Sequence, residues 1–194
     1  DSALTAETAG TRAKENFTQA VEFVYENKSV EFNTTEEVKK FITQLANILN
    51  RGIIKEGVLI RQGADSQKYP YTRVADLENA LRSFYEELLK KINDHTIDPV
   101  ELSAWVEYKI DLTDNYFADG CGKVAKVMSA WVMMRNGHRA PDYTAGGKIK
   151  PENARSEYYQ HAPKTIPGTN LEIEQEEWNQ WLAYYKTLCS ETKQ

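Results

Sequence analysis

The chain has 194 residues, of which 41% are hydrophobic and 11% aromatic, and its formal net charge is -5 at pH 7. This length and apolar content can form one core, so we expect a single domain across residues 1–194. The acidic balance argues against a general DNA- or RNA-binding protein, because Lys and Arg provide most of the affinity for nucleic-acid phosphates. No apolar run approaches the roughly 20 residues of a transmembrane helix, so we expect no membrane partner.

The cysteines and the first residue bear on localisation. With only Cys121 and Cys189, a metal cluster or a disulfide framework is not expected, and a reducing compartment is indicated. The chain begins at Asp1 rather than Met, which indicates that an upstream segment has been cut away. We therefore expect a cytoplasmic protein or one delivered into a host cell. The sequence indicates no oligomeric state.

The first 50 residues contain two amphipathic helix patterns. From Thr11 to Asn27, apolar side chains recur at helical spacing. The sequence Asn33-Thr-Thr-Glu36 has the features of an N-cap with its capping-box partner, and it predicts the start of a second helix that ends at Gly52.

The sequence pattern changes from helical to β-prone over residues 57–71, GVLIRQGADSQKYPY. A short β-prone run, a Gly-Ala-Asp-Ser turn and a second extended piece predict a small β-hairpin with an exposed edge. Two further helices are expected after it, one from about Val74 to Ile92 and one starting at Asp98, where Asp is the cap and Pro is the first helical residue.

The domain is organised around residues 115–137, NYFADGCGKVAKVMSAWVMMRNG. Nearly every position from Val124 to Met134 is apolar, so a helix here must run through the middle of the domain. Just before it, Gly120 and Gly122 let backbone N–H groups converge at a helix N-terminus, where the macrodipole favours an anion. The sequence therefore outlines a phosphate cradle.

Charged side chains accompany this cradle. Lys123 and Lys126 add positive charge one turn apart, and Asp119 supplies a hard oxygen ligand of the kind that Mg²⁺ takes in nucleotide sites. Cys121 is interpreted as a small loop residue, although a thiol at a helix N-terminus beside Lys123 is in a setting that lowers its pKa. The three histidines of the chain lie in polar contexts and are interpreted as surface residues.

After Gly137 we expect a loop, a short helix over residues 152–161 that carries Tyr158 and Tyr159, and a last helix over residues 171–189. The total is about seven helices and one hairpin. The predicted fold class is mainly α.

The central stretch resembles the signature of the Fic/Doc family, HPFx[DE]GNGRxxR followed by an apolar helix. Four positions match it: Phe117, Asp119, Gly120 and Gly122. Lys123 and Lys126 stand where the family has arginines. Asn115 takes the place of the catalytic histidine, Tyr116 that of the proline and Cys121 that of the asparagine.

The order of elements around this motif is similar to a Fic domain as well. The resemblance implies N-terminal helices over residues 1–50, a Fic-like core over 51–160 and a C-terminal helix over 161–194. In that family the hairpin is a flap that aligns a target protein by strand addition. By position, residues 60–68 would be the flap, and Ile60, Arg61 and Gln62 would contact the target.

The resemblance also implies an activity, the transfer of AMP or another phosphate-containing group from ATP to a hydroxyl of a target protein. It assigns the Mg²⁺ ligand to Asp119, the anion nest to Gly120, Cys121 and Gly122, and the charge clamp to Lys123 and Lys126. ATP, or another nucleotide, and Mg²⁺ are the implied cofactors.

The catalytic base does not carry over, because the amide of Asn115 has no titratable lone pair near neutral pH. The nearest carboxylates are Asp114 and Asp111. Three hypotheses follow: a divergent adenylyltransferase or phosphotransferase that uses another base or none, a non-catalytic Fic-fold module that binds a nucleotide or a protein, and an unrelated helical interaction protein. We favour a Fic-like fold with retained phosphate binding and altered or lost transfer.

Overall fold

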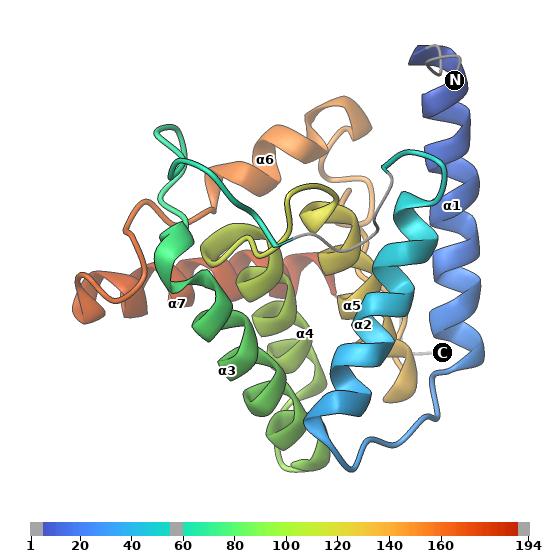
Figure 1. Cartoon of the computed structure of the whole chain (residues 1–194), viewed down its shortest axis with the longest axis horizontal. Helices are drawn as coiled ribbons and strands as arrows, with labels where there is room; N and C mark the ends of the chain where they lie inside the picture. Colours follow the sequence, from blue (N-terminus) through green and yellow to red (C-terminus); the bar gives the residue numbers. More distant parts are fainter. Residues whose placement is uncertain (1–5, 55–59, 190–194) are drawn as a thin grey trace.

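The computed structural model describes residues 6–54 and 60–189, and within them the chain forms seven α-helices (Figure 1). These are α1 (Ala6–Glu26), α2 (Thr35–Asn50), α3 (Val74–Asn93), α4 (Pro99–Glu107), α5 (Cys121–Arg135), α6 (Ala154–Gln160) and α7 (Leu171–Leu188), with a π-helical turn η1 (Tyr108–Thr113) and a 3₁₀ turn η2 (Pro151–Asn153). The mainly α fold class is confirmed. No helix in the described ranges is both long and apolar enough to cross a bilayer.

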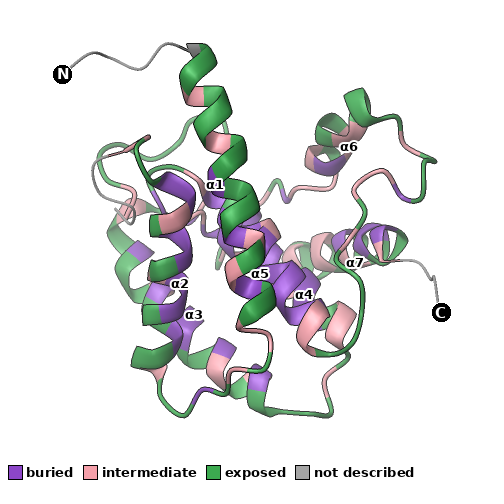
Figure 2. Ribbon diagram, turned by 90° about the vertical axis from the view of Figure 1, so that its right-hand side faces the viewer, coloured by how far each residue is buried: buried purple, intermediate pink, exposed green. Residues whose placement is uncertain are grey.

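Helix α5 runs through the middle of the domain, as the sequence predicts. It contacts α1, α2 and α4, and buried residues follow α4 and α5 while the outer side of α1 is exposed (Figure 2). Trp131 on α5 is fully buried against the rings of Phe32 and Phe41. A helix that is apolar on most sides can only be placed between other elements, which is why α5 is the centre.

The buried side chains form two clusters. The first joins α1, α2, α3, α4 and α5, and the second joins α4, η1, α6 and α7 around Trp181 and Tyr185. Helix α4 belongs to both, because Leu102 and Val106 face the first cluster while Ala104 faces the second. Helices α4 and η1 therefore lie between two packed regions, and polar residues at their ends are placed where these regions meet.

The start of α2 differs from the sequence prediction by one residue. The N-cap is Thr34 and its partner is Glu37, not the pair Asn33 and Glu36. The Glu37 carboxylate accepts hydrogen bonds from the backbone N–H groups of both Asn33 (2.7 Å) and Thr34 (3.2 Å), so this frame satisfies two donors with one side chain. The other predicted cap is confirmed: Asp98 Oδ1 accepts from the N–H groups of Val100 and Glu101.

The hairpin expected over residues 57–71 is not confirmed. Residues 55–59 lie outside the described ranges, and residues 60–71 show one isolated antiparallel bridge, between Ile60 and Phe117, and no strand. The backbone N–H of Arg61 donates to the carbonyl of Tyr116 (2.9 Å). This segment is therefore attached to residues 114–120, called the signature loop below, at the position where the flap was expected.

A buried amide links the first two helices to each other. Asn16 on α1 is buried and donates to the carbonyls of Leu49 (3.0 Å) and Arg51 (2.9 Å) at the end of α2. Asn16→Ala should lower the free energy of unfolding by about 1–3 kcal/mol, because one buried and one partly buried carbonyl lose their donor. Urea unfolding measures this, with exposed Glu15→Ala as the matched control. Equal stability of the two variants would contradict the assigned role.

Candidate functional site

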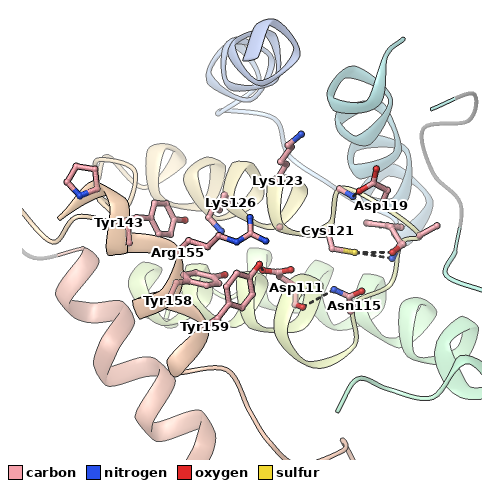
Figure 3. A pocket seen from close by; sticks show the side chains of 16 residues that line it. Asp111, Asn115, Asp119, Cys121, Lys123, Lys126, Tyr143, Arg155, Tyr158 and Tyr159 are labelled. Carbon is pink, nitrogen blue, oxygen red and sulfur yellow. Dashed lines mark hydrogen bonds between the residues drawn. The ribbon is translucent and has the colours of Figure 1, made fainter. Parts of the chain in front are cut away.

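A cavity of about 590 Å³ lies between the N-terminus of α5 and helix α6 (Figure 3). It brings together all of the predicted loop and helix residues except Asp114: Asn115, Asp119, Gly120, Cys121, Gly122, Lys123 and Lys126. It adds further polar residues that the motif did not indicate: Asp111, Tyr143, Arg155, Tyr158 and Tyr159. Ile60, Arg61 and Gln62 do not line it.

Two residues in left-handed backbone conformation shape the loop before α5. Asn115 has φ 53°, which Asn tolerates better than most residues, and its side-chain amide donates to the carbonyl of Asp111 (3.0 Å). Gly120 has φ 79°, and a Cβ there would lie 3.1 Å from Oδ1 of Asn50. Gly120 is therefore required both by its conformation and by the close approach of the end of α2.

The first turn of α5 is open toward the cavity. Gly120 is its N-cap and provides no side-chain cap, while Asp119 Oδ1 accepts from the backbone N–H of Gly120 (2.7 Å). A 15-residue helix concentrates partial positive charge at this end. The anion nest expected at this helix end stays a prediction, and these are the backbone N–H groups on which it depends.

The thiol of Cys121 is part of the loop packing. Its Sγ accepts from the backbone N–H of Phe117 (3.2 Å) and donates to the carbonyl of the same residue (3.3 Å). Burial raises the pKa of Cys121 to about 12. The lowered pKa expected from a helix N-terminus and Lys123 is not supported, because desolvation of the thiolate outweighs the hydrogen bond with Phe117 and the charge of Arg61, which lower the pKa.

Two cations face the tyrosines of the cavity. Lys126 Nζ lies 4.0 Å from the ring centroid of Tyr158 and 5.0 Å from that of Tyr143. The Arg155 guanidinium extends from α6 toward Lys126 (Figure 3). Lys123 is exposed, and its side chain points away from Lys126 and Arg155, toward the side of α1 (Figure 3). The cations that face the cavity interior are thus Lys126 and Arg155.

Asp111 is the buried carboxylate of the cavity. It lies on η1, and its Oδ2 accepts from the hydroxyl of Tyr159 (3.1 Å). Burial raises the pKa of Asp111, and the charges of Lys126 and Arg155 offset this only in part. A Cβ on Gly122 would lie 3.5 Å from the same oxygen, so the carboxylate lies directly beside the first turn of α5.

Asp114 has a different environment. It is 2% exposed and does not line the cavity. Its Oδ2 pairs with Lys109 Nζ (2.9 Å) and accepts from the Tyr116 hydroxyl (2.6 Å), and its Oδ1 accepts from the Thr72 hydroxyl. The partners of Asp114 hold the loop in place, and of the two carboxylates nearest to Asn115 in the sequence only Asp111 lines the cavity.

The carboxylates are compatible with a Mg²⁺ ion that arrives with its ligand. No group of three or more His, Cys, Asp and Glu side chains converges in the described part of the chain. Mg²⁺ at nucleotides typically takes only one or two protein carboxylates and completes its shell with water and phosphate. Asp119 is exposed at the mouth, and Asp111 lines the same cavity, so a partial set of this kind is present.

Several residues that line the cavity lie outside the signature motif and were not predicted as site residues. Tyr158 and Tyr159 were placed on a short helix but not assigned to the site, and Arg155 precedes them by one turn or less. Their only signal in the sequence is a pair of aromatic hydroxyls beside a cation on a helix that is otherwise polar. Tyr143 lies in a loop and carried no signal.

The fold is Fic-like. No protein-family profile matches the chain, and no curated protein matches it. Among solved structures, a Fic-domain-containing signaling protein from Bacteroides thetaiotaomicron superposes with a TM-score of 0.69 at 18% identity, over 97% of this chain and 72% of that one. Fic-1 from C. elegans superposes with a TM-score of 0.58 at 17% identity, over 91% of this chain and 48% of that one.

The raised pKa of Asp111 predicts how stability depends on pH. Because the folded-state pKa of Asp111 lies above the unfolded value of about 4, the contribution of this side chain to stability is greatest below pH 4 and is lost as pH rises through the folded-state pKa. Asp111→Asn removes this loss, so its free energy of unfolding relative to the native protein should increase from pH 4 to pH 7. Parallel urea titrations measure the difference, and a difference independent of pH would contradict the assignment.

Proposed function

We propose that this protein binds a nucleotide or another phosphate-bearing ligand in the cavity, and that its capacity for AMP or phosphoryl transfer is altered or lost. The observation that carries the proposal is the meeting of an uncapped α5 N-terminus with Lys126 and Arg155 in one cavity. Backbone N–H groups at a helix N-terminus together with two cations form a recurring arrangement for phosphate oxygens.

Each part of the cavity has a role in this proposal. The nest of Gly120 and Gly122 would accept one phosphate group, and Lys126 and Arg155 would neutralise its charge. Asp119, with Asp111 nearby, would hold Mg²⁺, which when bound supplies further positive charge to phosphate oxygens. The volume of about 590 Å³ is in the range of small-molecule sites.

Whether the protein can transfer AMP or a phosphoryl group depends on the residue at position 115. In the family that this chain resembles, a histidine there accepts the proton of the attacking hydroxyl, and a positioned base contributes typically ~10²–10⁴ in rate. Asn115 cannot do this. Its amide instead donates to the carbonyl of Asp111, which keeps it beside the cavity without a proton-accepting role.

A second candidate is a transferase with a displaced base, and one observation favours it. The Asp111 carboxylate lines the cavity beside Gly122, and its raised pKa makes it a better proton acceptor than an ordinary aspartate. An attacking hydroxyl would then lose its proton to Asp111 Oδ1 or Oδ2. This candidate and the binding protein differ only in whether labelled nucleotide reaches a protein target.

A target protein that docks along residues 60–68 belongs to the same proposal. Ile60 already forms an antiparallel bridge with Phe117 of the signature loop, so a docked strand would lie close to the cavity mouth. Arg61 is less free than Gln62: its guanidinium donates to the carbonyls of Thr72 (2.6 Å), Asp114 (3.1 Å) and Asn115 (3.0 Å).

Calorimetry with Mg-ADP and Mg-ATP tests the binding. Lys126→Ala and Arg155→Ala should each weaken affinity by about tenfold or more, because each removes one charge-assisted contact. Lys123→Ala should have a smaller effect, and exposed Lys90→Ala on α3 is the matched control with the same loss of charge. A native protein that binds neither nucleotide at millimolar concentration would remove the basis for the proposal.

Transfer is tested by restoring the imidazole. Asn115→His should create or raise the labelling of protein with radioactive nucleotide, because His also tolerates the left-handed backbone at this position. Asn115→Gln is the control that keeps an amide. Labelling by the native protein that is lost in Asp111→Asn would instead establish the transferase with a displaced base. No labelling by any folded variant would leave only the binding function.

A further inference from the structure

Glu107, the last residue of α4, is a carboxylate with no exposed surface. Three hydroxyls donate to it: Ser129 to Oε1 (2.6 Å), Tyr158 to Oε2 (2.7 Å) and Tyr143 to Oε1. No ion pair of the described residues includes it. A carboxylate buried without a cation is costly, so the hydroxyls around it must compensate, and a role beyond filling space is indicated.

Two of the three hydroxyls that donate to Glu107 belong to the tyrosine rings that carry Lys126. Tyr143 and Tyr158 both line the cavity, and the Lys126 ammonium lies over their faces. A phenol that donates to a carboxylate has a more electron-rich ring, which attracts a cation more strongly. The negative charge of Glu107 therefore acts on Lys126 through two tyrosines, from behind the cavity wall.

The same arrangement recurs one helical turn further along. Asp111 accepts from the hydroxyl of Tyr159, and the Arg155 guanidinium lies 5.5 Å from the ring centroid of that tyrosine. Two carboxylates four residues apart thus bind consecutive tyrosines of α6, and each of these tyrosines carries one cation. The repetition indicates that the hydrogen bonds that attach α6 to Glu107 and Asp111 also position the cations Lys126 and Arg155.

We infer that Glu107 is a positioning residue, which holds the Lys126 ammonium in the cavity through Tyr143 and Tyr158. The part of this inference that concerns ligand affinity rests on the proposed function. Without the carboxylate, both tyrosines lose their shared acceptor, and the long side chain of Lys126 is no longer held over the rings. Glu107 itself touches no ligand in this arrangement, because the tyrosines lie between it and the cavity.

The test compares Glu107→Gln with Glu101→Gln, an exposed change of the same kind on the same helix. The first measurement is the NMR shift of the Lys126 side-chain methylene protons in lysine-labelled protein, assigned with Lys126→Arg. Aromatic ring currents should move these signals upfield in the native protein, because the ammonium lies over two ring faces. Glu107→Gln should reduce the upfield shift, and Glu101→Gln should leave it unchanged. The second measurement is affinity for inorganic pyrophosphate, which should fall about three- to tenfold in Glu107→Gln only.

Tyr158→Phe is the second variant, because it removes one hydrogen bond to Glu107 and keeps the ring under Lys126. It should change the Lys126 signals in the same direction as Glu107→Gln, but less, and it decides the question if Glu107→Gln does not fold. Native-like Lys126 signals in the folded variants would overturn the inference even if stability fell, since Glu107 would then serve packing alone. Changed signals in a protein that never binds pyrophosphate would support the positioning role and count against the proposed ligand.

Discussion

The placement of the signature loop depends on the buried carboxylate of Asp114. It joins three elements at once: Lys109 on η1, Thr72 before α3, and Tyr116 within the loop itself. A buried charge is tolerated only when its lone pairs are satisfied, and breaking one such set is typically costly by several kcal/mol. The loop therefore has one well-determined conformation, and the start of α5 is fixed with it.

Arg61 also holds the signature loop in place, through the backbone of the loop rather than its side chains. Its guanidinium binds three backbone carbonyls, including those of Asp114 and Asn115, and its backbone N–H donates to Tyr116. A carboxylate and a guanidinium thus hold the same short piece of chain by its side chains and by its backbone. This explains why the acid next to Asn115, Asp114, is structural, while the acid three residues earlier, Asp111, lines the cavity.

Some of this architecture could be read from the sequence because local composition decides it. The central helix is apolar on most sides, so no packing other than burial was open to it. The loop before it was also predictable, since Gly120 and Gly122 match a spaced pattern. The capping box of α2 was misplaced because Asn33-Glu36 and Thr34-Glu37 offer the same spacing, and only the carboxylate geometry selects the second.

The rest of the site could not be predicted, because it depends on contacts between distant segments. Glu107 reads as an ordinary helical glutamate until Tyr143 and Tyr158 approach it from 36 and 51 residues away. The widening of the helix into η1 has no sequence signal, yet Asp111 lies on this turn. π-helical turns occur frequently at functional sites, where they redirect a side chain without ending the helix.

The cavity combines opposite charges, which a phosphate ligand of the proposed kind would meet together. Lys126 and Arg155 favour a phosphate, whereas the carboxylate of Asp111, which lies beside the nest at Gly122, opposes it. If the proposed phosphate ligand binds, a free phosphate group would bind with uptake of a proton by Asp111, because the neutral acid removes the repulsion and the raised pKa makes this step less costly. A phosphate that carried a divalent cation would not need the proton, since the carboxylate would then face a positive charge. Under the proposed function, the dependence of binding on pH, with and without Mg²⁺, would thus follow from one buried side chain.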